Sequence, residues 1–126
     1  DLAPMVLSAA VMLWTGGFDI IYSLQDIDFD RRHGLFSLPA RIGPAAALAV
    51  SRLFHAGMVA LLVVFGMLTG AGPIYYAGAA FTAGFLIWEQ SLVSPKDFGR
   101  VNTAFFTLNG CASVCLFIFI ALDVFL

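Results

Sequence analysis

Charged side chains are scarce in this sequence: only 11% of its 126 residues are Asp, Glu, Lys or Arg, whereas 61% are hydrophobic. An ordinary soluble domain is about 45–50% apolar. The mean hydropathy of +0.97 therefore excludes an ordinary soluble fold. The nearly uncharged stretches are long enough to cross a hydrocarbon core about 30 Å thick, so we expect the lipid bilayer to surround the protein.

Cysteine is also rare. Cys111 and Cys115 stand four apart in an apolar run with no other metal ligand near them, so we expect two small buried hydrophobic residues rather than a disulfide or a metal pair. The chain begins at Asp1 without an initiator Met or a basic segment before its apolar run, and no signal peptide is evident. We expect a piece of a longer polytopic protein.

Four hydrophobic blocks fill most of the chain, and each has about the length that a membrane-spanning helix needs. Glycine and proline separate them at Gly43-Pro44, at Gly70 to Pro73 and at Ser94-Pro95. Repeats are absent. The sequence predicts an all-α, polytopic membrane helix bundle, with transmembrane helices over residues 2–24, 44–68, 73–92 and 101–126.

Basic residues gather in two of the three connections. The loop 25–43 holds Arg31, Arg32 and Arg41, and the loop 93–100 holds Lys96 and Arg100. Because the first and third connections of a four-helix serpentine lie on one side of the membrane, the positive-inside rule places both loops in the cytoplasm. Both chain ends then face the other side.

Three carboxylates and a tyrosine mark the end of the first block. On a continued helix Asp19, Tyr22, Asp26 and Asp30 would point along one face, since they are three, four and four residues apart. Neighbouring carboxylates repel one another at membrane depth, so a cation should offset them. Mg²⁺ prefers such hard oxygens, usually one or two carboxylates together with substrate phosphates, and Asp26 and Asp30 suit that role.

The residues next to these carboxylates indicate which ligand the segment could bind. Arg31 and Arg32 could donate bidentate hydrogen bonds to the oxygens of a diphosphate. For Asp28 and for either arginine, a solvated charge at the membrane surface is an equal alternative. An EF-hand is excluded, because Arg31 stands where that loop needs glycine and Ser37 where it needs glutamate.

The pattern Asp19-x-x-Tyr22-x-x-x-Asp26-x-x-x-Asp30, followed by Arg32-x-Gly34-x-x-Ser37-x-Pro39-x-Arg41-x-Gly43, resembles the second aspartate-rich motif of the UbiA superfamily of intramembrane prenyltransferases. The resemblance is closest to the 4-hydroxybenzoate and menaquinone-pathway polyprenyltransferases. It implies a nine-helix fold with two aspartate-rich motifs facing a cavity. Asp26 and Asp30 would bind Mg²⁺ and diphosphate, Asp19 and Tyr22 would belong to the catalytic face, and residues 25–43 would form a cytoplasmic cap in which Ser37 and Arg41 close over the diphosphate with Arg31 and Arg32.

This sequence departs from the family pattern in one respect, because the first motif, Asn/Asp-x-x-x-Asp, is missing from these residues. The four helices would correspond to the sixth through ninth of the family fold. Residues 1–126 would then be the C-terminal portion of the domain, needing the earlier helices of the same protein as partners.

Five further polar residues lie in the later blocks. We expect Arg52 and His55 to make contacts between helices or to snorkel. Glu89 and Gln90 are expected at the membrane interface, and Asn109 is expected to form a hydrogen bond between helices, with a place in the cavity wall as its alternative.

The leading function is Mg²⁺-dependent transfer of a polyprenyl group from prenyl diphosphate to an aromatic acceptor in ubiquinone or menaquinone biosynthesis. The expected location is the bacterial inner membrane, with no nucleic-acid partner. A CDP-alcohol phosphatidyltransferase is one alternative, although the Asp-Gly and Ala-Arg elements of that family are missing between Asp26 and Asp30. An ion-coupled transporter is the other, with Asp19 and Asp26 binding the cation and Gly16-Gly17 as the helix break.

Overall fold

The computed structural model describes residues 2–35, 37–93 and 101–126, without the side chains of Gln25 and of residues 101–108. Every regular element in these ranges is helical, as the all-α prediction requires. The long helices agree with the predicted boundaries to within one residue. The elements are α1 (Leu2–Ser23), a 3₁₀ turn (Leu24–Asp26), α2 (Ile27–Arg32), α3 (Leu38–Ile42), α4 (Pro44–Thr69), α5 (Pro73–Ser91) and α6 (Val101–Phe125).

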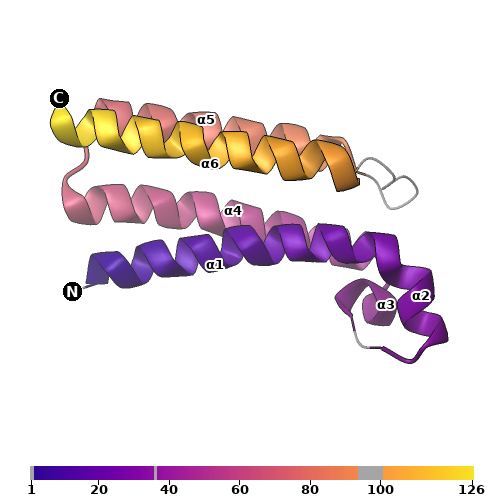
Figure 1. The fold of residues 1–126 in the computed structure, drawn as a ribbon. Helices are drawn as coiled ribbons and strands as arrows, with labels where there is room; N and C mark the ends of the chain where they lie inside the picture. Colours follow the sequence, from indigo (N-terminus) through magenta and orange to yellow (C-terminus); the bar gives the residue numbers. More distant parts are fainter. Residues whose placement is uncertain (1, 36, 94–100) are drawn as a thin grey trace.

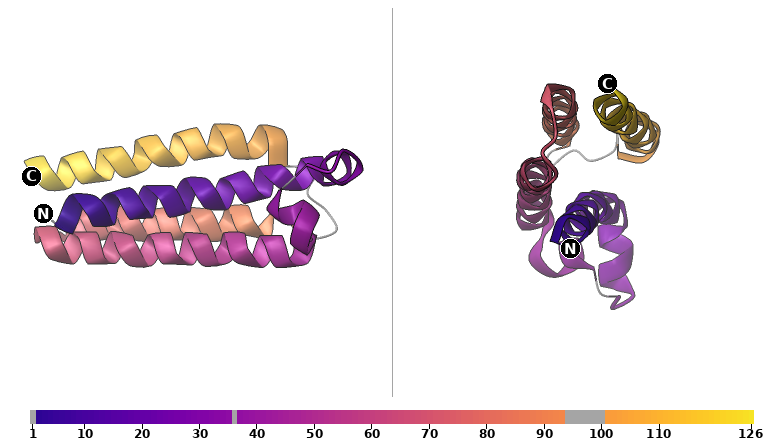
Figure 2. Two further views of the ribbon diagram at one scale, coloured as in Figure 1. Left: turned by 90° about the horizontal axis from the view of Figure 1, so that it is seen from below. Right: turned by 90° about the vertical axis from the view of Figure 1, so that its left-hand side faces the viewer.

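The long helices form two pairs. Helix α1 packs along α4, and α5 packs along α6, while α4 also contacts α5. Seen end on, the helices follow an arc in the order α1, α4, α5 and α6 (Figure 2). Helices α2 and α3 lie together at one end of the bundle, and both chain termini lie at the other (Figure 1). The segment predicted to cap the bundle is therefore well separated from the termini.

Two helices, α1 and α4, are long and apolar enough to cross a membrane by length and composition. The part of α6 whose side chains are described, Asn109–Phe125, is a shorter apolar helix. Four membrane spans therefore stay a prediction.

The connection between α4 and α5 shows why the chain reverses there. Gly70 ends α4 in the left-handed conformation (φ 65°), which favours glycine, and Pro73 begins α5, where its fixed φ suits the first helical position. The side chain of Asp123 on α6 accepts hydrogen bonds from the amides of Gly72 (3.0 Å) and Tyr75 (3.2 Å). A carboxylate at a helix N-terminus satisfies amides that the helix leaves free, so Asp123 fastens the end of α6 to the start of α5.

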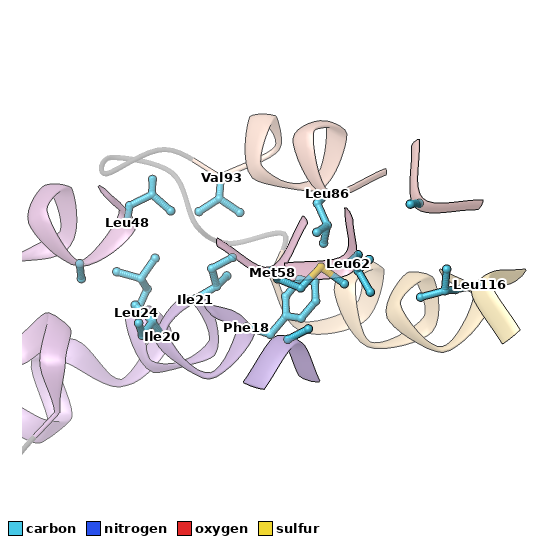
Figure 3. Close-up of a cluster of buried hydrophobic side chains, with 13 residues drawn as sticks. Phe18, Ile20, Ile21, Leu24, Leu48, Met58, Leu62, Leu86, Val93 and Leu116 are labelled. Atoms are coloured by element: carbon cyan, nitrogen blue, oxygen red, sulfur yellow. The ribbon is translucent and has the colours of Figure 1, made fainter. Parts of the chain in front are cut away.

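The apolar core lies mainly where α1, α4 and α5 meet (Figure 3). Phe18 and Ile21 of α1 face Leu48, Met58 and Leu62 of α4, and α5 and α6 add further apolar side chains, among them Leu86 and Leu116. Lipid is as apolar as these side chains, so close packing and hydrogen bonds, more than a hydrophobic force, hold such helices together.

The structure differs from the sequence predictions for residues 25–43 and for Cys111, and it does not describe Lys96 and Arg100. Residues 25–43, predicted as a loop, contain α2 and α3. Both cysteines are free, but Cys111 is exposed in this chain and Cys115 half-buried, so the predicted burial of Cys111 was wrong. The basic residues Lys96 and Arg100 lie outside the described residues.

Candidate active site

The four predicted catalytic residues lie at the end of α1 and in the segment that follows it. The prediction that they share one continuous helical face was wrong, because a 3₁₀ turn ending at Asp26 (φ −103°, ψ 12°) interrupts the α-helix. A 3₁₀ turn has about 3.0 residues per turn instead of 3.6. Asp26 and Asp30 are consequently turned relative to Asp19 and Tyr22, and α2 leaves the axis of α1 (Figure 1).

The carboxylates of this segment are accessible. Asp19 and Asp26 are exposed and Asp30 is half-buried. Within the described ranges no group of three His, Cys, Asp or Glu side chains lies close enough to hold a metal. Asp26 and Asp30 thus supply at most a pair of hard oxygen ligands, and a pair is what Mg²⁺ commonly takes from a protein when phosphate and water complete its shell. The donor chemistry of the pair fits Mg²⁺.

The cap is held together by the residues predicted to bind diphosphate. Arg31 donates from Nε to the carbonyl of Ala40 in α3 (3.1 Å), and Arg32 donates from Nε to the carbonyl of Asp28 (3.3 Å). Both bonds use Nε, so they do not occupy the terminal guanidinium nitrogens. Ser37 accepts a hydrogen bond from the amide of Ala40 (3.3 Å) and caps the N-terminus of α3, while Arg41 is exposed in the last turn of that helix.

A hydrogen bond joins the two ends of the helical arc. The side-chain amide of Asn109 on α6 donates to the hydroxyl of Tyr22 on α1 (3.2 Å), which confirms the expected bond between helices. Tyr22 also interacts electrostatically with Asp19 and with Glu89 of α5. Tyr22 is therefore bonded to α6, and its place on the catalytic face stays a prediction.

The sequence analysis was wrong about Glu89 and Gln90, which are buried between helices and not interfacial. Glu89 is 0% exposed, and its two carboxylate oxygens have no hydrogen-bond partner among the described residues. Buried carboxyl groups are costly in a membrane protein and commonly functional. The signal was present in the sequence as a carboxylate within a hydrophobic block, but its place near the block's end favoured the interface.

Gln90 belongs to a buried polar network that links α1, α4 and α5. Its amide nitrogen donates to the Ser51 hydroxyl (3.0 Å) and lies 3.0 Å from Nδ1 of His55. Ser51 donates to the carbonyl of Gly17 (2.8 Å), and Nε2 of His55 lies 3.2 Å from the carbonyl of Trp14. A carbonyl only accepts, so we assign the proton to Nε2 and let Nδ1 accept from Gln90.

This network confirms the expected helix contact of His55. Arg52 makes one too, donating to the backbone carbonyls of Gln90 in α5 and of Val93 just beyond that helix. Gly17 lets the two helices approach, since a β-carbon at this position would overlap the His55 ring. The network therefore fixes α1 against its neighbours close to Asp19 and Tyr22.

Comparisons with known proteins agree with the resemblance of this sequence to the UbiA superfamily. Residues 1–111 match the model of the UbiA prenyltransferase family. The chain is 31% identical over 117 residues to a 4-hydroxybenzoate octaprenyltransferase of Shewanella halifaxensis, covering 93% of this chain and 40% of the relative. It is 34% identical over 100 residues to 4-hydroxybenzoate geranyltransferase 1 of Lithospermum erythrorhizon, covering 77% and 32%.

A solved structure agrees as well. The apo structure of a UbiA homolog from Aeropyrum pernix K1 superposes with a TM-score of 0.82 at 42% identity, over 96% of this chain and 42% of that one. The chain thus spans about two fifths of the length of the octaprenyltransferase that it matches. On this evidence the chain belongs to the UbiA prenyltransferase family, whose members are embedded in membranes.

Proposed function

We propose that the protein to which this chain belongs transfers a polyprenyl group from a prenyl diphosphate to an aromatic acceptor in ubiquinone or menaquinone biosynthesis. The observation that supports this most is that the exposed Asp26 and the half-buried Asp30 stand in the segment that also carries Arg31 and Arg32, in a chain of the UbiA family. Family membership favours prenyl transfer over an ion-coupled transporter or a CDP-alcohol phosphatidyltransferase.

The residues present suggest how the donor would be held. Asp26 and Asp30 would bind Mg²⁺, which when bound neutralises the diphosphate and stabilises its charge. The terminal guanidinium nitrogens of Arg31 and Arg32 would donate to diphosphate oxygens, helped by Arg41 and by the hydroxyl of Ser37. These contacts strengthen as the bond between the allylic carbon and oxygen breaks with its electron pair leaving on the diphosphate, so they favour the transition state.

The acceptor would approach from the side of Asp19 and Tyr22. Its electron-rich ring carbon would form the new bond to the allylic carbon, and the ring would then lose a proton to water to become aromatic again. Asn109, which donates a hydrogen bond to the Tyr22 hydroxyl, would keep that hydroxyl oriented in this wall. The acceptor of the matched relatives is 4-hydroxybenzoate by their names, and we propose the same compound as the first to test.

We further propose that residues 1–126 are the C-terminal portion of the domain, with four of nine membrane helices, in the bacterial inner membrane and with residues 25–43 in the cytoplasm. Earlier helices of the same protein would supply the opposing aspartate-rich motif. The basic residues of this segment support its cytoplasmic placement, and the coverage of about two fifths of a relative supports the missing helices.

The test uses the full-length protein in membranes, with labelled prenyl diphosphate and 4-hydroxybenzoate. Replacing Asp26→Asn or Asp30→Asn should lower Mg²⁺-dependent transfer on the order of a hundredfold, as the loss of one charge-stabilising group does. Asp28→Asn is the matched control, because Asp28 is exposed on α2 beside Asp30 but outside the spacing of the motif. Undiminished transfer in both the Asp26 and Asp30 variants would contradict the metal assignment.

A further inference from the structure

A cavity of about 530 Å³ lies between α4 and α5 and contains none of the aspartates considered above. Its polar lining includes Arg52, Gln90 and Ser91, and its apolar lining includes Val59, Leu86 and Ile87. Cavities of 300–1,000 Å³ with mostly apolar walls and a few polar groups are typical of sites for small amphiphilic molecules.

The polar and apolar parts lie at different depths along the helices. Arg52 lies about 10 Å nearer to the start of α4 than Val59, since an α-helix rises 1.5 Å per residue. Helix α5 runs in the opposite direction and ends at Ser91, so Gln90 and Ser91 lie at the same end as Arg52. That end is the one where α2 and α3 lie (Figure 1).

The guanidinium group of Arg52 stands at this polar end with donors to spare. It is exposed, and Nη2 is 3.3 Å from the carbonyl of Val93 and 3.5 Å from that of Gln90. These bonds fix the side chain across the two helices without using Nε or Nη1. Within the described parts of the chain no carboxylate pairs with Arg52. An anion can therefore bind to the remaining donors.

The cavity opens away from α1. Helix α4 turns Ser51 and Gly57 toward α1, where Ser51 bonds Gly17 and Gly57 lies against Leu13. Two lining residues, His55 and Gln90, belong to the network that faces α1. On the other side Ala56 is exposed, and Ile87 on α5 is 71% exposed. The cavity therefore opens on the outer surface of this chain.

We propose that this cavity binds one anionic phospholipid from the leaflet at the α2 and α3 end, with its phosphate on Arg52 and an acyl chain along Val59, Leu86 and Ile87. Basic pockets between membrane helices recognise lipid head groups in this way. A phosphodiester carries one negative charge, which a single arginine matches. A prenyl diphosphate carries more charge and would need further cations, so it suits this cavity less well.

The experiment measures lipid binding to the purified full-length protein by native mass spectrometry and by the shift in Tm, using phosphatidylglycerol, phosphatidylcholine and free glycerol phosphate as separate probes. Phosphatidylglycerol should bind and raise Tm, and Arg52→Gln should weaken that binding about fivefold, the effect of losing one basic residue near the membrane surface. Ala56→Phe, which fills the cavity while keeping Arg52, should weaken it as well. Ala60→Phe is the matched control on the same helix, exposed and outside the lining, and should bind like the wild type.

Several outcomes would overturn the proposal. They are equal binding of phosphatidylcholine and phosphatidylglycerol, protection by glycerol phosphate alone, unchanged binding in both Arg52→Gln and Ala56→Phe, and displacement of the lipid by prenyl diphosphate. The last would instead assign the cavity to the prenyl donor. Because none of these measurements uses prenyl transfer, a failure of the lipid site is distinguishable from a failure of the proposed enzyme activity.

Discussion

Asn109 on α6 donates a 3.2 Å hydrogen bond to the hydroxyl of Tyr22 on α1 and so joins the two outer helices of the arc. Bonds of this kind between membrane helices contribute on average about 0.6 kcal/mol. In a double-mutant cycle of Tyr22→Phe and Asn109→Ala, the free energy of unfolding in detergent should show a coupling of about that size. Ser113→Ala, on the exposed face of α6, replaces Asn109→Ala in the control cycle. A coupling of zero for Tyr22 and Asn109 would show that the bond does not hold α6 to α1.

The contact of Gly17 with His55 predicts opposite effects for the same substitution at two glycines. Gly17→Ala places a methyl group into the His55 ring and should lower the free energy of unfolding by about 1–3 kcal/mol, the usual cost of overpacking. Gly84→Ala, on α5 with open space around it, should be neutral or stabilising by up to about 1 kcal/mol, because alanine favours a helix. Thermal unfolding of the two full-length variants measures both changes in stability. Equal stability would mean that the close approach of α1 and α4 is not maintained.

The carboxylate of Asp123 predicts a stability effect far from the proposed site. Asp123→Ala removes the acceptor for the amides of Gly72 and Tyr75 and should cost about 0.5–2 kcal/mol, as the loss of a helix cap does. Transfer by the remaining folded protein should be unchanged. Asp123→Asn, which keeps one acceptor oxygen, should be intermediate. A loss of activity without a loss of stability would contradict a purely structural role.

Residues 1–126 alone are predicted to show no prenyl transfer. Asp19 and Asp26 are exposed in this chain, and the opposing aspartate-rich motif of the family pattern is not part of it. Expression of residues 1–126 in membranes, assayed beside the full-length protein with the same labelled donor, checks this. Measurable turnover by the isolated chain would refute it.

The sequence predicted the helices well, because hydrophobic length and Gly or Pro signals are local. Pro44 and Pro73 begin α4 and α5 as expected, and Gly70 ends α4. The break at Leu24–Asp26 was not predictable in the same way. The same intervals of three and four residues occur in a continuous α-helix and in an α-helix interrupted by one 3₁₀ turn. The pattern of Asp19, Tyr22, Asp26 and Asp30 therefore did not distinguish the two.

The other features that the sequence did not predict depend on contacts between distant parts of the chain. Whether Glu89 is buried depends on which helices pack beside it, so a carboxylate near the end of a hydrophobic block does not by itself distinguish burial from a place at the interface. The same holds for Gln90, whose partners Ser51 and His55 lie on α4, and for Asp123, which caps a helix about fifty residues earlier in the chain. Asn109 was predictable as a hydrogen-bonding residue between helices, but its partner Tyr22 was not.

The most direct test of the central proposal replaces Mg²⁺ by Mn²⁺ and follows its binding by electron paramagnetic resonance in the full-length protein with a non-reactive prenyl diphosphate analogue. The proposal predicts a bound Mn²⁺ signal that depends on the analogue in the wild type and in Asp28→Asn, and its loss in Asp26→Asn and in Asp30→Asn. The same signal in all four proteins would contradict the assignment of Asp26 and Asp30 as the residues that hold the metal against the diphosphate.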